Sequence, residues 1–195
     1  DNYARAWASV PYLRLFLNTI YVSIATALIQ VVIIFFGAYS LSILKPFGNK
    51  ASNLIFFLIG ITIFIPFHII SIPVFVTVRA IGWIDTYRAL IIPKIAWTMG
   101  FFLMKIYFDG LAPEISKKKA MGYSDGRIFK EIILPRGLPW AGMLTVVSIF
   151  QNWQEFGWPL ITGKKLLAIG MASFQGLHVT DWSILMAGAV IIDFL

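Results

Sequence analysis

Long apolar stretches separated by short polar connections dominate this chain, and they predict membrane-spanning helices. Asp, Glu, Lys and Arg are absent from residues 15–44 and 51–78, and about twenty apolar residues suffice to carry a helix across a bilayer core. Residues 137–154 also lack these charges, whereas residues 90–108 and 182–195 are weaker candidates. We therefore predict an all-α membrane protein, a polytopic transmembrane helix bundle with spans at about 15–44, 52–73, 89–108, 137–160 and 182–195.

Prolines modify the prediction for the second span. Pro66 and Pro73 predict a kink or a helix break between them, because proline lacks the N–H that an inner helical turn requires. Residues 74–84 are then expected to form a short helix on the membrane surface.

Composition supports the membrane assignment and limits the partners. With 59% hydrophobic and 13% charged residues, the chain has too little polar surface for a water-soluble globule. The formal net charge of +7 does not predict a nucleic-acid partner here, because the basic residues concentrate in two alternate connections, near residues 45–50 and 117–136. The positive-inside rule places both connections in the cytoplasm. The sequence has no cysteine, which excludes disulfides and cysteine-ligated metals.

The second basic connection has the pattern of a folded polar segment. Residues 112–139 read APEISKKKAMGYSDGRIFKEIILPRGLP. We predict one short helix that begins at Ala112 and Pro113 and stops at Gly122 with positive φ. A second helix, capped by Ser124, is predicted to end at Pro135. The alternative is an ordinary solvated loop whose lysines only set the topology.

The spacing inside this segment resembles the cytoplasmic loop of permease subunits of bacterial ABC importers. The family signature is E-A-A, three residues, G, nine residues, I-x-L-P. The matching residues are Gly122, Ile132, Leu134 and Pro135, whereas Ser116, Lys117 and Lys118 stand at the E-A-A positions. Four further segments resemble, in order, the maltose-permease-like carbohydrate (type I) importers: NYARAWASVPYLRLFLNTIYVSI, IPVFVTVRAIGWIDTYRALIIP, FQNWQEFGWPLI and MASFQGLHVTDWSILMAGAV. The resemblance implies one transmembrane domain over residues 1–195, with about five spans present and six in the full chain.

In that family the loop is a coupling helix that docks in a groove of the ATPase subunit. The resemblance implies a coupling loop at residues 111–136, with contacts from Glu114, Ser116, Lys117, Lys118, Ala120, Gly122, Ile132, Leu134 and Pro135. It implies a permease subunit of an ATP-driven, binding-protein-dependent sugar or oligosaccharide importer in the bacterial cytoplasmic (inner) membrane. Its partners would be a second permease in a heterodimer, two ATPase subunits that bind ATP-Mg, an extracytoplasmic sugar-binding protein and membrane lipid. The chain itself would carry no cofactor and no catalytic residue.

A different class of function stays open beside this one. In an ion-coupled secondary transporter, Glu155, Lys94 or His68 would carry the coupling charge. Residues 157–165 do not form a phosphate-binding loop, because they have one residue too many between the glycines and lysine where serine or threonine belongs. His68 and His178 stand apart from other metal-ligating residues in the sequence, so we predict no metal site and no catalysis at either.

Polar residues at membrane depth indicate a candidate translocation path. A charge at mid-helix costs about 2.5–3.5 kcal/mol on insertion, so such residues tend to face a water-filled path or a partner. Gln30 and Lys94 are candidates, together with a cluster near residue 152. The cluster that we predict to line the path comprises Gln151, Asn152, Trp153 and Glu155. Amides bind sugar hydroxyls and indoles stack on pyranose faces, but the same residues would also suit packing against a second permease subunit.

Overall fold

The computed structural model describes residues 2–9, 11–163, 166–170, 182–183, 186–187 and 190. Helices joined by short turns make up this part of the chain, and no strand occurs within it, which confirms the predicted all-α membrane class. The predicted span at 182–195 falls mostly outside the described residues, as does His178.

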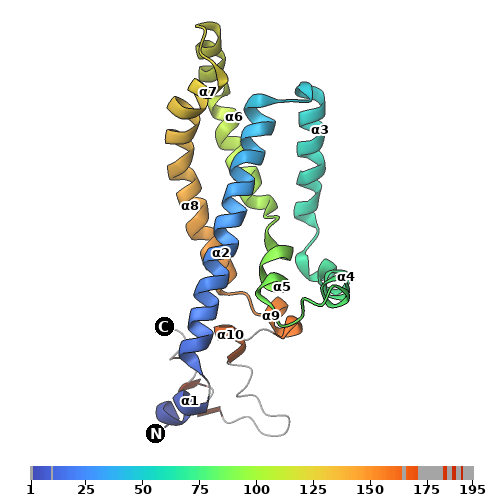
Figure 1. Cartoon of the computed structure of the whole chain (residues 1–195), viewed down its shortest axis with the longest axis vertical. Helices are drawn as coiled ribbons and strands as arrows, with labels where there is room; N and C mark the ends of the chain where they lie inside the picture. Colours follow the sequence, from blue (N-terminus) through green and yellow to red (C-terminus); the bar gives the residue numbers. More distant parts are fainter. Residues whose placement is uncertain are drawn as a thin grey trace. The chain divides into compact units, whose positions relative to one another are not determined.

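The α-helices of the described chain are labelled in Figure 1, and short π-helical and 3-10 segments lie between some of them. They are α1 (Asn2–Ser9), α2 (Tyr12–Tyr39), the π-helical η1 (Ser40–Leu44), α3 (Gly48–Ile61), the 3-10 turn η2 (Thr62–Phe64), α4 (Phe67–Ala80), α5 (Tyr87–Ile91), the 3-10 turn η3 (Ile92–Lys94), α6 (Thr98–Ala120), α7 (Asp125–Ile128), the π-helical η4 (Phe129–Ile133), α8 (Leu134–Trp153), α9 (Gly157–Thr162) and α10 (Leu167–Gly170). The chain forms two compact units. The first comprises Asp1–Thr26, Ser71–Pro93 and Ile149–Leu195, and the second comprises Ala27–Ile70 and Lys94–Ser148.

Two helical runs are long and apolar enough to cross a membrane without a break, Tyr12–Leu44 and Asp125–Trp153. Two further pairs pass the same test but are bent: Gly48–Phe64 with Phe67–Ala80, by 96°, and Tyr87–Lys94 with Thr98–Ala120, by 42°. Counting each bent pair as one span brings the number of spans in the described chain to four.

The first bend has a local cause at Pro66. Ile65 leaves the helical region, with φ −98° and ψ 99°, because a residue before proline is excluded from helical geometry by the proline ring. The break expected between Pro66 and Pro73 therefore lies at Pro66. The helix that follows begins at Phe67 rather than at residue 74, and it includes Pro73.

The core of the second unit is built from α2, α6, η4 and α8. Its completely buried side chains include Ala38, Met104, Phe108, Ile133 and Leu144. The rings of Phe35 and Phe108 pack edge to face, with their centroids 5.2 Å apart. A Cβ added at Gly137 would lie 2.6 Å from the Phe35 ring and 3.1 Å from the Phe108 ring. The glycine therefore lets the backbone of α8 approach these two rings.

Hydrogen bonds link the elements of the first unit. The Trp158 indole is buried, and its Nε1 donates to the Ala89 carbonyl over 2.8 Å. The backbone N–H of Asp85 donates to the Thr162 carbonyl over 2.9 Å. Near the start of α2, the Thr19 hydroxyl accepts the backbone N–H of Leu167 over 2.9 Å. Short helices that are marginal alone are thus held by tertiary contacts.

Candidate coupling site

The polar segment after residue 111 continues α6 instead of beginning a new helix. α6 runs without interruption from Thr98 to Ala120 and includes Pro113, so the predicted helix start at Ala112 and Pro113 is wrong. Proline costs an inner helix one hydrogen bond. Burial of Phe108 and Ile115 on either side of Pro113 supports the continuous helix.

The turn that ends α6 is the one predicted at Gly122. Gly122 has φ +84°, its N–H donates to the Lys119 carbonyl over 2.9 Å, and the N–H of Tyr123 donates to the Lys118 carbonyl over 3.1 Å. This pair of bonds is a Schellman motif, which closes a helix C-terminus and favours glycine because φ is positive.

Ser124 begins the next helix, also as predicted. Its Oγ accepts the backbone N–H of Arg127 over 3.4 Å, at the start of α7. The helix does not end at Pro135, however, which corrects the expectation: η4 leads directly into α8, and α8 contains Pro135 and Pro139. The wider π-helical turn η4 ends two residues before Pro135, whose missing N–H interrupts the regular hydrogen-bond ladder.

Charged side chains on this segment pair with one another. Lys119 contacts Asp125 at 2.7 Å, and Arg127 contacts Glu131 at 2.8 Å. The Lys118 ammonium lies 4.9 Å from the centroid of the Tyr123 ring, and the Arg127 guanidinium lies 4.1 Å from the same centroid. The segment is therefore an ordered polar knob, here defined as residues 114–136, rather than an unstructured solvated loop.

The residues predicted to couple to an ATPase separate into two groups. Those on the surface of the knob are Ser116, Lys117, Ala120, Gly122 and Pro135, whereas Glu114, Lys118 and Leu134 are half-buried and Ile132 is buried. The Ser116 hydroxyl, at the first position of the acidic part of the family signature, donates to the Ala112 carbonyl of its own helix over 2.9 Å. Ile132 belongs to a buried apolar cluster that also includes Ile115, Ile128 and Ile133 of the knob, so this motif position supports the fold of the knob.

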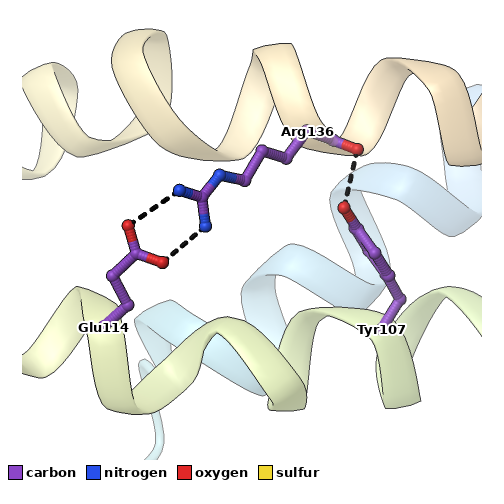
Figure 2. Close-up of polar contacts among 3 residues, drawn as sticks. All are labelled: Tyr107, Glu114 and Arg136. Atoms are coloured by element: carbon purple, nitrogen blue, oxygen red, sulfur yellow. Dashed lines mark hydrogen bonds and ion pairs between the residues drawn. The ribbon is translucent and has the colours of Figure 1, made fainter.

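An ion pair joins the two helices that carry the knob (Figure 2). Arg136 at the start of α8 donates from both terminal nitrogens to the Glu114 carboxylate of α6, over 2.5 and 2.9 Å. The Tyr107 hydroxyl of α6 donates to the Arg136 carbonyl over 2.9 Å. The Tyr107 ring also stacks on Trp140 at 5.3 Å. Glu114 was among the predicted coupling residues, whereas Arg136 and Tyr107 were not. The only signal in the sequence was a carboxylate and a guanidinium at opposite ends of the basic segment.

The residues predicted to line a path differ in exposure and in their contacts. Within the first unit, Gln151 is exposed, Asn152 is buried, and Trp153 packs edge to face on Phe16 at 5.7 Å. Glu155 accepts the backbone N–H of Trp158 over 3.2 Å at the beginning of α9. Trp153 and Glu155 thus have structural contacts, and their role in a path stays a prediction.

Gln30, another polar candidate, connects helices of the second unit. Its Nε2 donates to the Lys94 carbonyl, and its Oε1 accepts the hydroxyl of Ser148 on α8. Gln30 and Ser148 are both buried. The amide therefore uses its oxygen and one N–H inside the bundle, which favours a structural role for Gln30 over contact with a transported solute.

We expect Gln30→Met to lower the free energy of unfolding of the chain by about 1–2 kcal/mol, because the thioether occupies a similar volume but forms neither hydrogen bond. The measurement is equilibrium unfolding in mixed detergent micelles. The matched control is Gln151→Met, since Gln151 is exposed on α8. Equal losses in the two variants would contradict the structural role of Gln30.

One cation is buried in the second unit and has its own partners. The Lys105 ammonium lies 2.6 Å from the Asp109 carboxylate, one turn further along α6, and 4.2 Å from the centroid of the Phe56 ring. These contacts compensate a charge whose side chain is only 7% exposed. Among the described residues, no group of three or more His, Asp or Glu side chains is placed to hold a metal ion.

Comparison with known proteins identifies the relatives of the chain. It is 27% identical over 184 residues to the arabinooligosaccharides transport system permease protein AraQ of Halalkalibacterium halodurans. The aligned region covers 92% of this chain and 65% of that relative. It is 27% identical over 198 residues to the probable ABC transporter permease protein YurM of Bacillus subtilis, covering 98% and 65% respectively. The diacetylchitobiose uptake system permease protein NgcG of Streptomyces coelicolor is 26% identical over 188 residues, with coverage of 93% and 61%.

The chain is similar to permeases of ABC transport systems for sugars. No protein-family model matches it. The homologous permeases bear out the family resemblance seen in the sequence, and their similarity extends over nearly the whole chain. The chain spans 61–65% of the length of these three permeases.

Proposed function

We propose that the chain is a permease subunit of an ATP-driven importer for sugars or oligosaccharides in the bacterial inner membrane, and that the knob docks on a separate ATPase subunit. The observation that carries the proposal is the knob itself. An ordered polar turn, with Gly122 at positive φ and at the signature spacing, stands between two long helices of a chain homologous to sugar permeases.

The geometry supports a mechanical role for this subunit. α6 and η4–α8 lead from the knob into the apolar bundle without a flexible linker. A displacement of the knob by the ATPase would therefore move both helices. In the proposed cycle, ATP closes the ATPase dimer and the bundle changes from an inward-facing to an outward-facing state. Coupling free energies of this kind are typically about 1–3 kcal/mol.

We assign ATP binding and hydrolysis to the separate ATPase subunits. ATP and Mg²⁺ would bind to the ATPase subunits, while this chain and a second permease, as a heterodimer, enclose the path and an extracytoplasmic binding protein delivers the sugar. The names of the homologous permeases, which refer to arabinooligosaccharides and diacetylchitobiose, support carbohydrate as the transported class. Asn152 and Gln151 stay candidates for sugar contact.

Reconstitution tests this function. Copurification of the full-length protein from native membranes is expected to recover a second permease and an ATPase. In proteoliposomes, uptake of a labelled oligosaccharide should require ATP, the ATPase and the binding protein, and the chain alone should be inert. Accumulation of solute by the chain alone under an ion gradient would contradict the proposal and favour the ion-coupled alternative.

A further inference from the structure

The Glu114–Arg136 pair differs from the other ion pairs of the knob in what it connects. Arg127–Glu131 lies within one helical run, and Lys119–Asp125 spans only the turn around Gly122. Among the described residues, Glu114–Arg136 is the ion pair that joins α6 directly to α8. It closes the knob at its base, across 22 residues of chain.

The apolar contacts inside the knob hold it together but do not fix a direction as hydrogen bonds do. Ile115, Ile128, Ile132 and Ile133 are buried members of one apolar cluster, and apolar contact is non-directional. Close packing limits axial shifts of α6 against α8, but it lacks the directional restraint that a hydrogen bond supplies. A force applied to the knob would then be lost partly as slip between α6 and α8.

A bidentate ion pair opposes this slip because it fixes both distance and direction. The two Arg136–Glu114 hydrogen bonds are reinforced by the bond from Tyr107 to the Arg136 carbonyl, seven residues before Glu114 on α6 (Figure 2). Arg136 is thus held by its side chain and by its backbone at two levels of the same helix. The axial position of α8 relative to α6 is defined at this point.

We propose that Glu114 and Arg136 are positioning residues that lock the axial register of α6 and α8, so that displacement of the knob reaches both helices together. This inference rests on the proposed function of the knob. Exposed ion pairs contribute little to overall stability, and both side chains are partly exposed, at 39% and 47%. Loss of the pair is therefore expected to reduce coupling while leaving the subunit folded.

The test compares Glu114→Gln with Glu131→Gln in the reconstituted complex. Both substitutions remove one carboxylate from an Arg–Glu pair, but only Glu114→Gln removes an ion pair between α6 and α8. We expect Glu114→Gln to lower the sugar transported per ATP hydrolysed by about fivefold, with assembly and the KM for ATP unchanged. The exchange variant Glu114→Arg with Arg136→Glu should recover most of the coupling, and Glu131→Gln should lower the coupling less than Glu114→Gln does, because its ion pair lies within one helical run.

A second measurement reports the register without relying on transport. The chain has no cysteine, so spin labels at Ile106→Cys on α6 and Leu138→Cys on α8, both exposed positions, give one interhelical distance. The distance distribution is expected to broaden in Glu114→Gln and to narrow again in the exchange variant.

The outcomes separate the two proposals. If the wild-type complex fails to transport, the proposed function is wrong, while the spin-label distances still report on the register. If the wild type transports and Glu114→Gln equals Glu131→Gln in coupling and in distance distribution, the positioning role is overturned. An assembled exchange variant that recovers neither property would also overturn it.

Discussion

Replacing Gly122 by valine is expected to lower ATP-dependent sugar uptake at least tenfold, while the chain still inserts in the membrane. Gly122 has φ +84°, and a β-branched residue in this region carries a strain of about 1–3 kcal/mol. That strain is comparable to a typical coupling free energy. The Schellman turn would reopen, and the exposed surface of Ser116, Lys117 and Ala120, which we propose to face the ATPase, would lose its fixed orientation.

Gly126 provides a matched control for this substitution. It lies four residues further along, in α7 and not at positive φ, and a Cβ at either glycine meets no atom within 4 Å. The two valine variants therefore differ chiefly in backbone conformation. Uptake and ATP hydrolysis are measured in the same proteoliposomes, and we expect Gly126→Val to retain both. Full uptake by Gly122→Val would remove the basis for a docking role of this turn.

Gly137→Val is expected to reduce the free energy of unfolding of the subunit by about 1–3 kcal/mol, the usual range for overpacking a core. The new Cβ would lie 2.6 Å from Phe35 and 3.1 Å from Phe108. Both rings are buried, with exposures of 6% and 0%, so neither has room to rotate away. Thermal unfolding of the isolated chain in detergent measures the effect.

Gly142 separates this clash from a general effect of valine in α8. It lies in the same helix, and an added Cβ there meets no atom within 4 Å. We expect Gly142→Val to unfold at the wild-type temperature. If both variants unfold at the same lowered temperature, close approach at Gly137 is not the cause.

Features that depend on neighbouring residues were predictable from the sequence. The positive φ at Gly122 and the cap at Ser124 were expected at the residues where they occur, because a helix end is closed by groups a few positions away. The first long span was also expected from local sequence, because the length of an uncharged apolar run sets the length of a membrane helix.

Whether a helix continues through a proline was less predictable, because the local sequence indicates only that one helical hydrogen bond is lost. Pro66 ends a helical run, whereas Pro113 and Pro135 lie inside helices. Proline removes one hydrogen bond in every case, but contacts from elsewhere decide whether the helix continues. Around Pro113 these contacts come from the buried side chains of Phe108 and Ile115.

The interactions that give the knob and the bundle their geometry join residues far apart in the chain. Glu114 meets Arg136 across 22 positions, and Gln30 meets Ser148 across 118. Periodicity and composition carry no information about which distant polar groups pair. Such pairs form because a buried or half-buried polar group must find a partner once the helices have packed, so they were visible only in the folded chain.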